Sequence, residues 1–124
     1  MKPVLARVEG PVYAMLRIVA GGLFAVHGAQ KLFAVLGGHQ PALFSQIWFA
    51  GLIEFVGGLM VAVGFCTSPV AFVCAGEMAV AYFQGHAPRG FWPVQNGGEL
   101  AVLYCFIFLY VAARGGGRWS IDRK

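Results

Sequence analysis

The sequence predicts an all-α integral membrane protein, a four-helix bundle in which each helix crosses a bilayer. Of its 124 residues, 59% are apolar or aromatic and 11% are charged, whereas about 25% of an ordinary soluble domain is charged. A mean hydropathy of +0.72 leaves too few polar residues to cover a water-soluble globule. A chain of this length forms one domain, residues 1–124.

Four stretches approach the roughly 20 mainly apolar residues that a spanning helix needs. They lie at about residues 12–36, 46–66, 69–85 and 98–114, the last two near the short limit.

Each break between the helices has its own local chemistry. Gly37 and Gly38 end the first helix. Thr67, Ser68 and Pro69 predict a tight turn with a helix cap and a proline at the first helical position. The segment between residues 85 and 98 contains Trp92 and predicts a loop in the membrane interface, the depth that tryptophan favours.

The positions of the basic residues predict the orientation. Loops on the cytoplasmic side carry an excess of Lys and Arg. Four spans place both termini on one side of the membrane. Six basic residues lie between the termini and the nearest helix ends on that side, whereas the opposite side has Arg89 and Lys31. Both termini are therefore predicted to be cytoplasmic. The six are Lys2, Arg7, Arg114, Arg118, Arg123 and Lys124.

Several other classes of protein are disfavoured. The basic residues do not cluster among aromatics on a polar face, so nucleic acid is not an expected partner. The three cysteines are odd in number and lie in apolar runs, which favours buried thiols over disulfides. Metal ligation and cofactor binding have no motif. A cleaved signal peptide is the alternative for the first segment, but its apolar stretch is too long.

Ionisable residues inside the predicted spans are the candidate functional groups. Such residues are costly in a bilayer, so they pair, face the bundle interior or line a site. On the first helix, Arg17, His27 and Lys31 fall on one face rich in small residues. Glu54, Glu77 and Glu99 lie on polar stripes of the next three helices.

Depth separates these groups into two sets. Lys31 lies roughly 28 Å from the cytoplasmic start of the first helix, and Glu54 roughly 9 Å from the opposite surface. A ligand-binding pocket in the outer half is therefore predicted to contain His27, Lys31, Glu54, Glu77 and Glu99. Arg17 is too deep on the cytoplasmic side to join it.

Two interpretations of these charges stay open. Buried pairs can simply fix which helix lies beside which, and for Arg17 this structural role is favoured. In the outer set, three carboxylates face one lysine and one histidine, so at least one carboxylate would favour its protonated form. This excess favours a proton-accepting pocket. His86, in the interfacial loop, is expected to be solvated rather than a ligand.

Five strings in order resemble the DoxX family over about residues 15–122. Residues 27–33 (HGAQKLF) are similar to its HGxxKL signature, and residues 115–122 (GGGRWSID) to its C-terminal GxGxWSxD. Residues 52–58 (LIEFVGG), followed by residues 63–65 (VGF) and Thr67, resemble its second helix and turn. Met78 with Ala81 fits its third helix, and residues 91–99 (FWPVQNGGE) resemble its last outer loop. The resemblance implies a four-helix inner-membrane bundle. Family members include a subunit of a thiosulfate:quinone oxidoreductase and proteins linked to thiol or quinone stress.

Two functions of different classes follow. The first is a quinone-linked or accessory subunit of a membrane oxidoreductase. The polar pocket would take a quinone head group beside Phe24 and Phe55, and electrons would come from a redox partner protein. The second is a non-enzymatic membrane module, namely an assembly factor, cargo receptor or small-solute carrier. A carrier would need a homo-oligomer, because four short helices make a narrow bundle.

Overall fold

The computed structural model describes residues 1–122, which contain helices and no strand. Three long helices are α1 (Glu9–Phe33), α4 (Thr67–Gly85) and α6 (Glu99–Arg114). Between α1 and α4 lies a composite helix, made of α2 (Gln46–Leu52), the π-helix η2 (Ile53–Gly57) and α3 (Gly58–Val63). The shorter elements are η1 (Ala6–Val8), η3 (Ala87–Arg89) and α5 (Pro93–Asn96).

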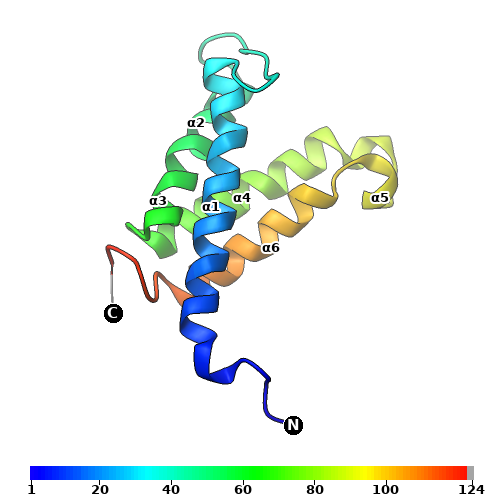
Figure 1. Ribbon diagram of the computed structural model, residues 1–124. Helices are drawn as coiled ribbons and strands as arrows, with labels where there is room; N and C mark the ends of the chain where they lie inside the picture. Colours follow the sequence, from blue (N-terminus) through cyan, green and yellow to red (C-terminus); the bar gives the residue numbers. More distant parts are fainter. Residues whose placement is uncertain (123–124) are drawn as a thin grey trace.

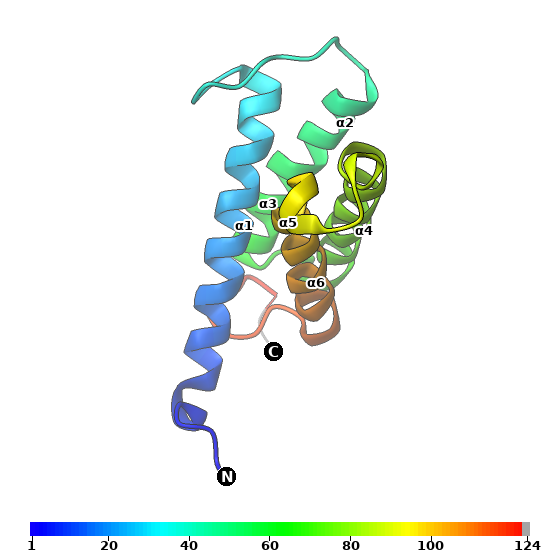
Figure 2. The same cartoon turned by 90° about the vertical axis from the view of Figure 1, so that its right-hand side faces the viewer.

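The helices pack as two pairs. The composite helix lies along α1, and α4 lies along α6. The second pair runs obliquely across the first (Figure 1), and in the view from the side α1 and α4 lie on opposite sides of the molecule (Figure 2). Phe24 of α1, Val61 of α3 and Phe108 of α6 are buried in the core between the pairs.

Helix length and surface composition fit an α-helical membrane protein. Two helical stretches, Ala6–Phe33 and Gln46–Val63, are long and apolar enough to cross a bilayer. Large apolar side chains also cover the outside of the molecule: Leu23, Phe72 and Phe106 are 55%, 65% and 66% exposed. An outer surface of this kind suits lipid better than water.

Glycines allow α1 and the composite helix to touch backbone to backbone. A Cβ atom on Gly21 would lie 2.6 Å from the Gly58 carbonyl oxygen, and one on Gly58 would lie 2.6 Å from that of Gly21. A Cβ atom on Gly28 would lie 2.2 Å from the Phe55 nitrogen. Side chains are excluded from this contact, so small residues bring the two helices together as they do in other membrane proteins.

Several helix ends differ by up to three residues from the expected positions: the first helix begins at Glu9 rather than near residue 12, and the second ends at Val63 rather than near residue 66. The first helix ends at Phe33 rather than near residue 36, because Ala34 adopts a left-handed conformation (φ 54°) and its N–H bonds to the Gln30 carbonyl. Helix α4 begins at Thr67 rather than at residue 69. Its N-cap is Cys66, with φ 50°, and no side chain of the turn caps it.

The cap of α4 comes instead from the far end of the chain. The Asp122 carboxylate accepts hydrogen bonds from the backbone N–H of Cys66 (2.9 Å) and of Thr67 (2.7 Å), and from the Thr67 hydroxyl (2.6 Å). The backbone N–H of Asp122 donates in turn to the Gly64 carbonyl at 2.8 Å. The predicted local cap was wrong, because a carboxylate brought in by tertiary structure satisfies these donors.

We expect the stability of the protein to depend on the ionisation of Asp122. Its hydrogen bonds from the Thr67 hydroxyl and then from the Thr67 backbone hold the pKa of Asp122 below its ordinary value. A carboxylate whose pKa is lower in the folded state stabilises above its unfolded-state pKa, and this contribution is lost as pH falls through the folded pKa. Thermal unfolding in detergent should therefore show stability falling below about pH 4.

The control for this prediction is Asp122→Asn, which should lower the unfolding temperature at neutral pH and flatten its decline in acid. An equally steep decline in the variant would show that other carboxyl groups cause the acid sensitivity.

Arg17 fastens the C-terminal segment to the helices. This side chain is 0% exposed and donates only to backbone carbonyls. Its Nε donates a hydrogen bond to the Val61 carbonyl oxygen of α3 at 3.0 Å. Its two terminal nitrogens donate to a further carbonyl of α3 and to carbonyls of the C-terminal segment. Those acceptors are Ala62 (3.3 Å), Gly116, Arg118 (2.8 Å) and Trp119 (2.6 Å). Five carbonyls, rather than a carboxylate, thus satisfy the charge.

Candidate functional site

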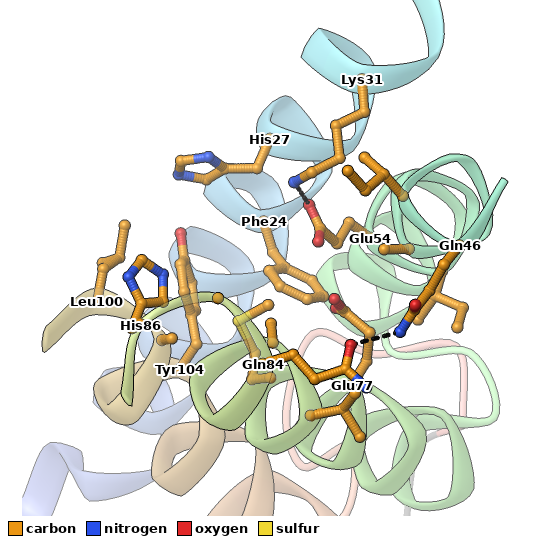
Figure 3. Close-up of a pocket in the computed structure, with 18 of the residues that line it drawn as sticks. Phe24, His27, Lys31, Gln46, Glu54, Glu77, Gln84, His86, Leu100 and Tyr104 are labelled. Carbon is orange, nitrogen blue, oxygen red and sulfur yellow. Dashed lines mark hydrogen bonds and ion pairs between the residues drawn. The ribbon is translucent and has the colours of Figure 1, made fainter. Parts of the chain in front are cut away.

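A cleft of about 960 Å³ opens between the two helix pairs (Figure 3). Residues of α1, the composite helix, α4 and α6 line it, together with the loop around His86. Much of its wall is apolar, including Phe24, Ile53 and Met78. The few polar side chains on such a wall decide what the cleft can bind.

The innermost polar contact is an ion pair between α1 and the composite helix. Lys31 Nζ lies 2.6 Å from Glu54 Oε1, and Figure 3 shows the two side chains pointing toward one another. The Glu54 side chain is 2% exposed and that of Lys31 is 32% exposed. The contact expected from helix depth is therefore confirmed.

The π-helix places Glu54 in this contact. The wide turn Ile53–Gly57 interrupts an otherwise α-helical segment, and Glu54 is its second residue. Such wide turns are rare and often occur at functional sites. The sequence predicted one uninterrupted helix over 46–66, because no residue pattern marks this change of winding.

Glu77 of α4 adds a second carboxyl group beside Glu54. The two carboxyl groups are near enough to repel one another, and the Lys31 ammonium group is near enough to attract Glu77. Glu77 Oε1 is buried and has no hydrogen-bond partner among residues 1–122. Two carboxyl groups thus meet one ammonium group, and one buried carboxyl oxygen has no hydrogen-bond partner within the described residues.

An aromatic wall stands opposite these charges. The His27 ring meets the Tyr104 ring edge-on, with centroids 6.1 Å apart, and Phe24 packs against Tyr104 at 5.1 Å. His27 therefore lies on the cleft as predicted, with Lys31, Glu54 and Glu77. Tyr104 was missed. Tyr104 and Phe108 are four positions apart, so they lie on the same face of α6, and both rings are buried there. This helical spacing of two aromatic residues was the available signal for Tyr104 in the sequence.

Asn96 organises the loop at the rim of the cleft. It is 1% exposed, and its Nδ2 donates to Tyr82 Oη and to the Gly90 carbonyl, both at 3.0 Å. His86 Nδ1 lies 3.2 Å from the Asn96 carbonyl oxygen. His86 was expected in solvent, but this contact holds it half-buried on the cleft wall.

A polar bridge also joins the two helix pairs at the rim. The Gln46 side-chain amide of α2 donates to Gln84 Oε1 of α4 at 2.6 Å (Figure 3). Both side chains line the cleft and are exposed. Gln46 and Gln84 were not predicted as site residues, because a glutamine at the end of a helix is common and does not by itself indicate a site.

Two predicted ionisable residues lie elsewhere. Glu99 is exposed in the first turn of α6 and is not part of the cleft wall, because α6 turns Ala101 and Tyr104 inward instead. Arg17 lies ten positions before His27 on α1, about 15 Å along the axis. The structure therefore brings together four of the five predicted pocket residues.

Together the fold and the cleft define an all-α membrane protein with ionisable side chains held among its helices. The chain belongs to the DoxX family, whose sequence model matches residues 12–87.

Two relatives extend the match over most of the chain. A Haemophilus influenzae protein described as uncharacterized is 40% identical over 118 residues, covering 90% of this chain and 88% of the relative. A Mycobacterium tuberculosis protein described as an uncharacterized membrane protein is 29% identical over 144 residues, covering 98% and 86%. No solved structure gives a significant match.

Proposed function

We propose that this protein is a quinone-linked or accessory subunit of a membrane oxidoreductase, and that the cleft holds the quinone head group. The observation that carries the proposal is the ion pair of Lys31 with the buried Glu54, beside Glu77 Oε1, which has no hydrogen-bond partner among residues 1–122. Apolar and aromatic walls surround these groups. A quinone head group is a flat ring with polar oxygens at opposite edges, so it needs both kinds of surface.

Each part of the cleft has a role in this proposal. The Lys31 ammonium group, which is partly exposed to the cleft, donates a hydrogen bond to one quinone oxygen. The other oxygen lies toward Glu77, whose free carboxyl oxygen exchanges a proton with the ring as the quinone gains or loses electrons. Tyr104 and Phe24 stack beside the ring. Electrons come from a partner protein, since the sequence contains no motif for a redox cofactor.

Binding to purified protein tests this proposal. In mild detergent, a short-chain benzoquinone or naphthoquinone should bind, and Lys31→Met or Glu77→Met should weaken binding at least tenfold, the effect of losing one charged hydrogen bond. Glu99→Gln is the matched control, because it removes a carboxylate outside the cleft and should leave affinity unchanged.

If no quinone binds, either to the protein alone or with co-purified partners, the proposal fails. A non-enzymatic membrane module then becomes the better interpretation of the same cleft.

We propose further that the protein lies in the bacterial inner membrane as a four-helix bundle, with all four long helices crossing and both termini cytoplasmic. Helix α4 has 19 residues and α6 has 16, about 28 and 24 Å of helix. Both present apolar side chains outward: Phe83 of α4 and Leu103 of α6 are 69% and 59% exposed. The basic residues near both termini favour the cytoplasmic side.

The topology prediction is direct. A reporter fused after Lys124 should be active in the cytoplasm, and one inserted near Pro88 should be active outside it. A periplasmic C-terminus would reverse the orientation, and a cytoplasmic Pro88 with a cytoplasmic C-terminus would show that α4 and α6 do not span.

A further inference from the structure

A second groove, of about 900 Å³, lies at the opposite end of α1 from the cleft. Its walls come from η1 and the first turn of α1, from the end of α6, and from the C-terminal segment. Three arginines line it, namely Arg7, Arg114 and Arg118, together with Glu9 and Trp119. None of these residues belongs to the cleft described above.

The charges in this groove are only partly balanced. Arg114 forms an ion pair with Glu9 and lies 4.2 Å from the centroid of the Tyr13 ring. Arg7 and Arg118 have no carboxylate partner within the part of the chain that the structure describes. The Arg118 side chain lies across Gly10, where a Cβ atom would be 3.1 Å from its Nε. The groove therefore has two uncompensated positive charges.

The position of the groove limits what can fill it. The helical stretch that is long and apolar enough to cross a membrane begins at Ala6, so the groove lies at one end of that stretch, where a spanning helix meets the headgroup layer. Trp119 is 60% exposed at the same level, the depth that tryptophan favours in a bilayer. The molecules present at this depth in a membrane are phospholipid headgroups.

We propose that this groove binds the phosphate-bearing headgroup of an anionic phospholipid, with Arg7 and Arg118 holding the phosphate. A guanidinium group presents paired N–H donors that match phosphate oxygens, which makes arginine well suited to this contact. Zwitterionic headgroups bring a cation close to the same arginines, so they bind less well. The Trp119 ring lies beside the part of the acyl chain nearest the headgroup.

The test is lipid binding to the full-length protein, measured by native mass spectrometry in mild detergent with phosphatidylglycerol, phosphatidylcholine or inorganic phosphate. Wild type should prefer phosphatidylglycerol severalfold over phosphatidylcholine. Because each surface arginine contributes roughly fivefold to attraction of anionic lipid, Arg7→Gln with Arg118→Gln should lower that binding more than tenfold. Glu9→Gln frees Arg114 and should raise it.

Lys2→Gln is the matched control, since Lys2 is exposed near the same end of the chain but lies outside the groove. An equal loss in this variant would overturn the proposal in favour of diffuse charge attraction. So would an absence of preference between the two lipids, or no gain in Glu9→Gln. Competition by inorganic phosphate at lipid-like concentrations would assign the groove to a free anion instead of a headgroup.

Discussion

Replacing Arg17 with leucine should destabilise the protein by about 3–5 kcal/mol, the usual cost of removing one member of a buried charged network. Five carbonyl oxygens from α3 and the C-terminal segment would lose their donor. Chemical or thermal unfolding of detergent-solubilised protein would measure the loss. Folded Arg17→Leu protein should still bind any cleft ligand with wild-type affinity, because Arg17 is remote from the cleft.

Arg17→Lys separates the charge from the geometry. Lysine keeps the positive charge but replaces three nitrogen atoms with one, so it cannot reach carbonyls on both sides. We expect it to recover only a small part of the lost stability. If Arg17→Lys were as stable as wild type, the positive charge alone, and not the geometry of the guanidinium group, would account for the stabilisation. Loss of ligand binding at unchanged stability would place Arg17 in the binding site.

Lys31→Met should cost about 2–3 kcal/mol of stability, since it leaves Glu54 buried without its cation and next to a second carboxyl group. Glu54→Gln should cost less, because Lys31 is partly exposed and can reach water. The double variant should recover part of the loss. A double-mutant cycle should give a coupling energy of about 1–3 kcal/mol.

The control cycle pairs Lys31→Met with Glu99→Gln. Glu99 is exposed and outside the cleft, so these two substitutions should be additive within a few tenths of a kcal/mol. A coupling energy near zero between Lys31 and Glu54 would mean that the ion pair contributes nothing beyond its separate side chains.

The parts of the molecule that could be predicted follow from repeating patterns. Apolar stretches of spanning length and their glycine breaks located the long helices to within a few residues. Depth along consecutive helices was enough to place Lys31 beside Glu54, and the small residues around both pointed to close helix contact. These inferences needed only the rise of an α-helix and the thickness of a bilayer.

The remaining features depend on contacts between distant parts of the chain. Asp122 caps α4 from more than fifty positions away, and no local pattern indicates that partner. The buried Asn96 fixes the path of the loop that precedes Glu99 and α6. The polar residues along α6 therefore did not suffice to predict which side of this helix faces the cleft. Tyr104 could not be singled out by its spacing from Phe108 alone, because aromatic residues occur on several faces of α6, at Phe106 and Tyr110 as well.

The wide turn at Ile53–Gly57 makes chain length matter within a helix. Loops tolerate insertions and deletions, but this stretch joins two fixed contacts with α1, at Gly28 and at Gly21. Deleting one residue would restore ordinary winding and rotate one half of the helix against the other by about 100°. Glu54 would then turn away from Lys31, or one glycine contact would break. A DoxX relative with a one-residue gap here would thus differ in its cleft, even if every aligned residue were identical.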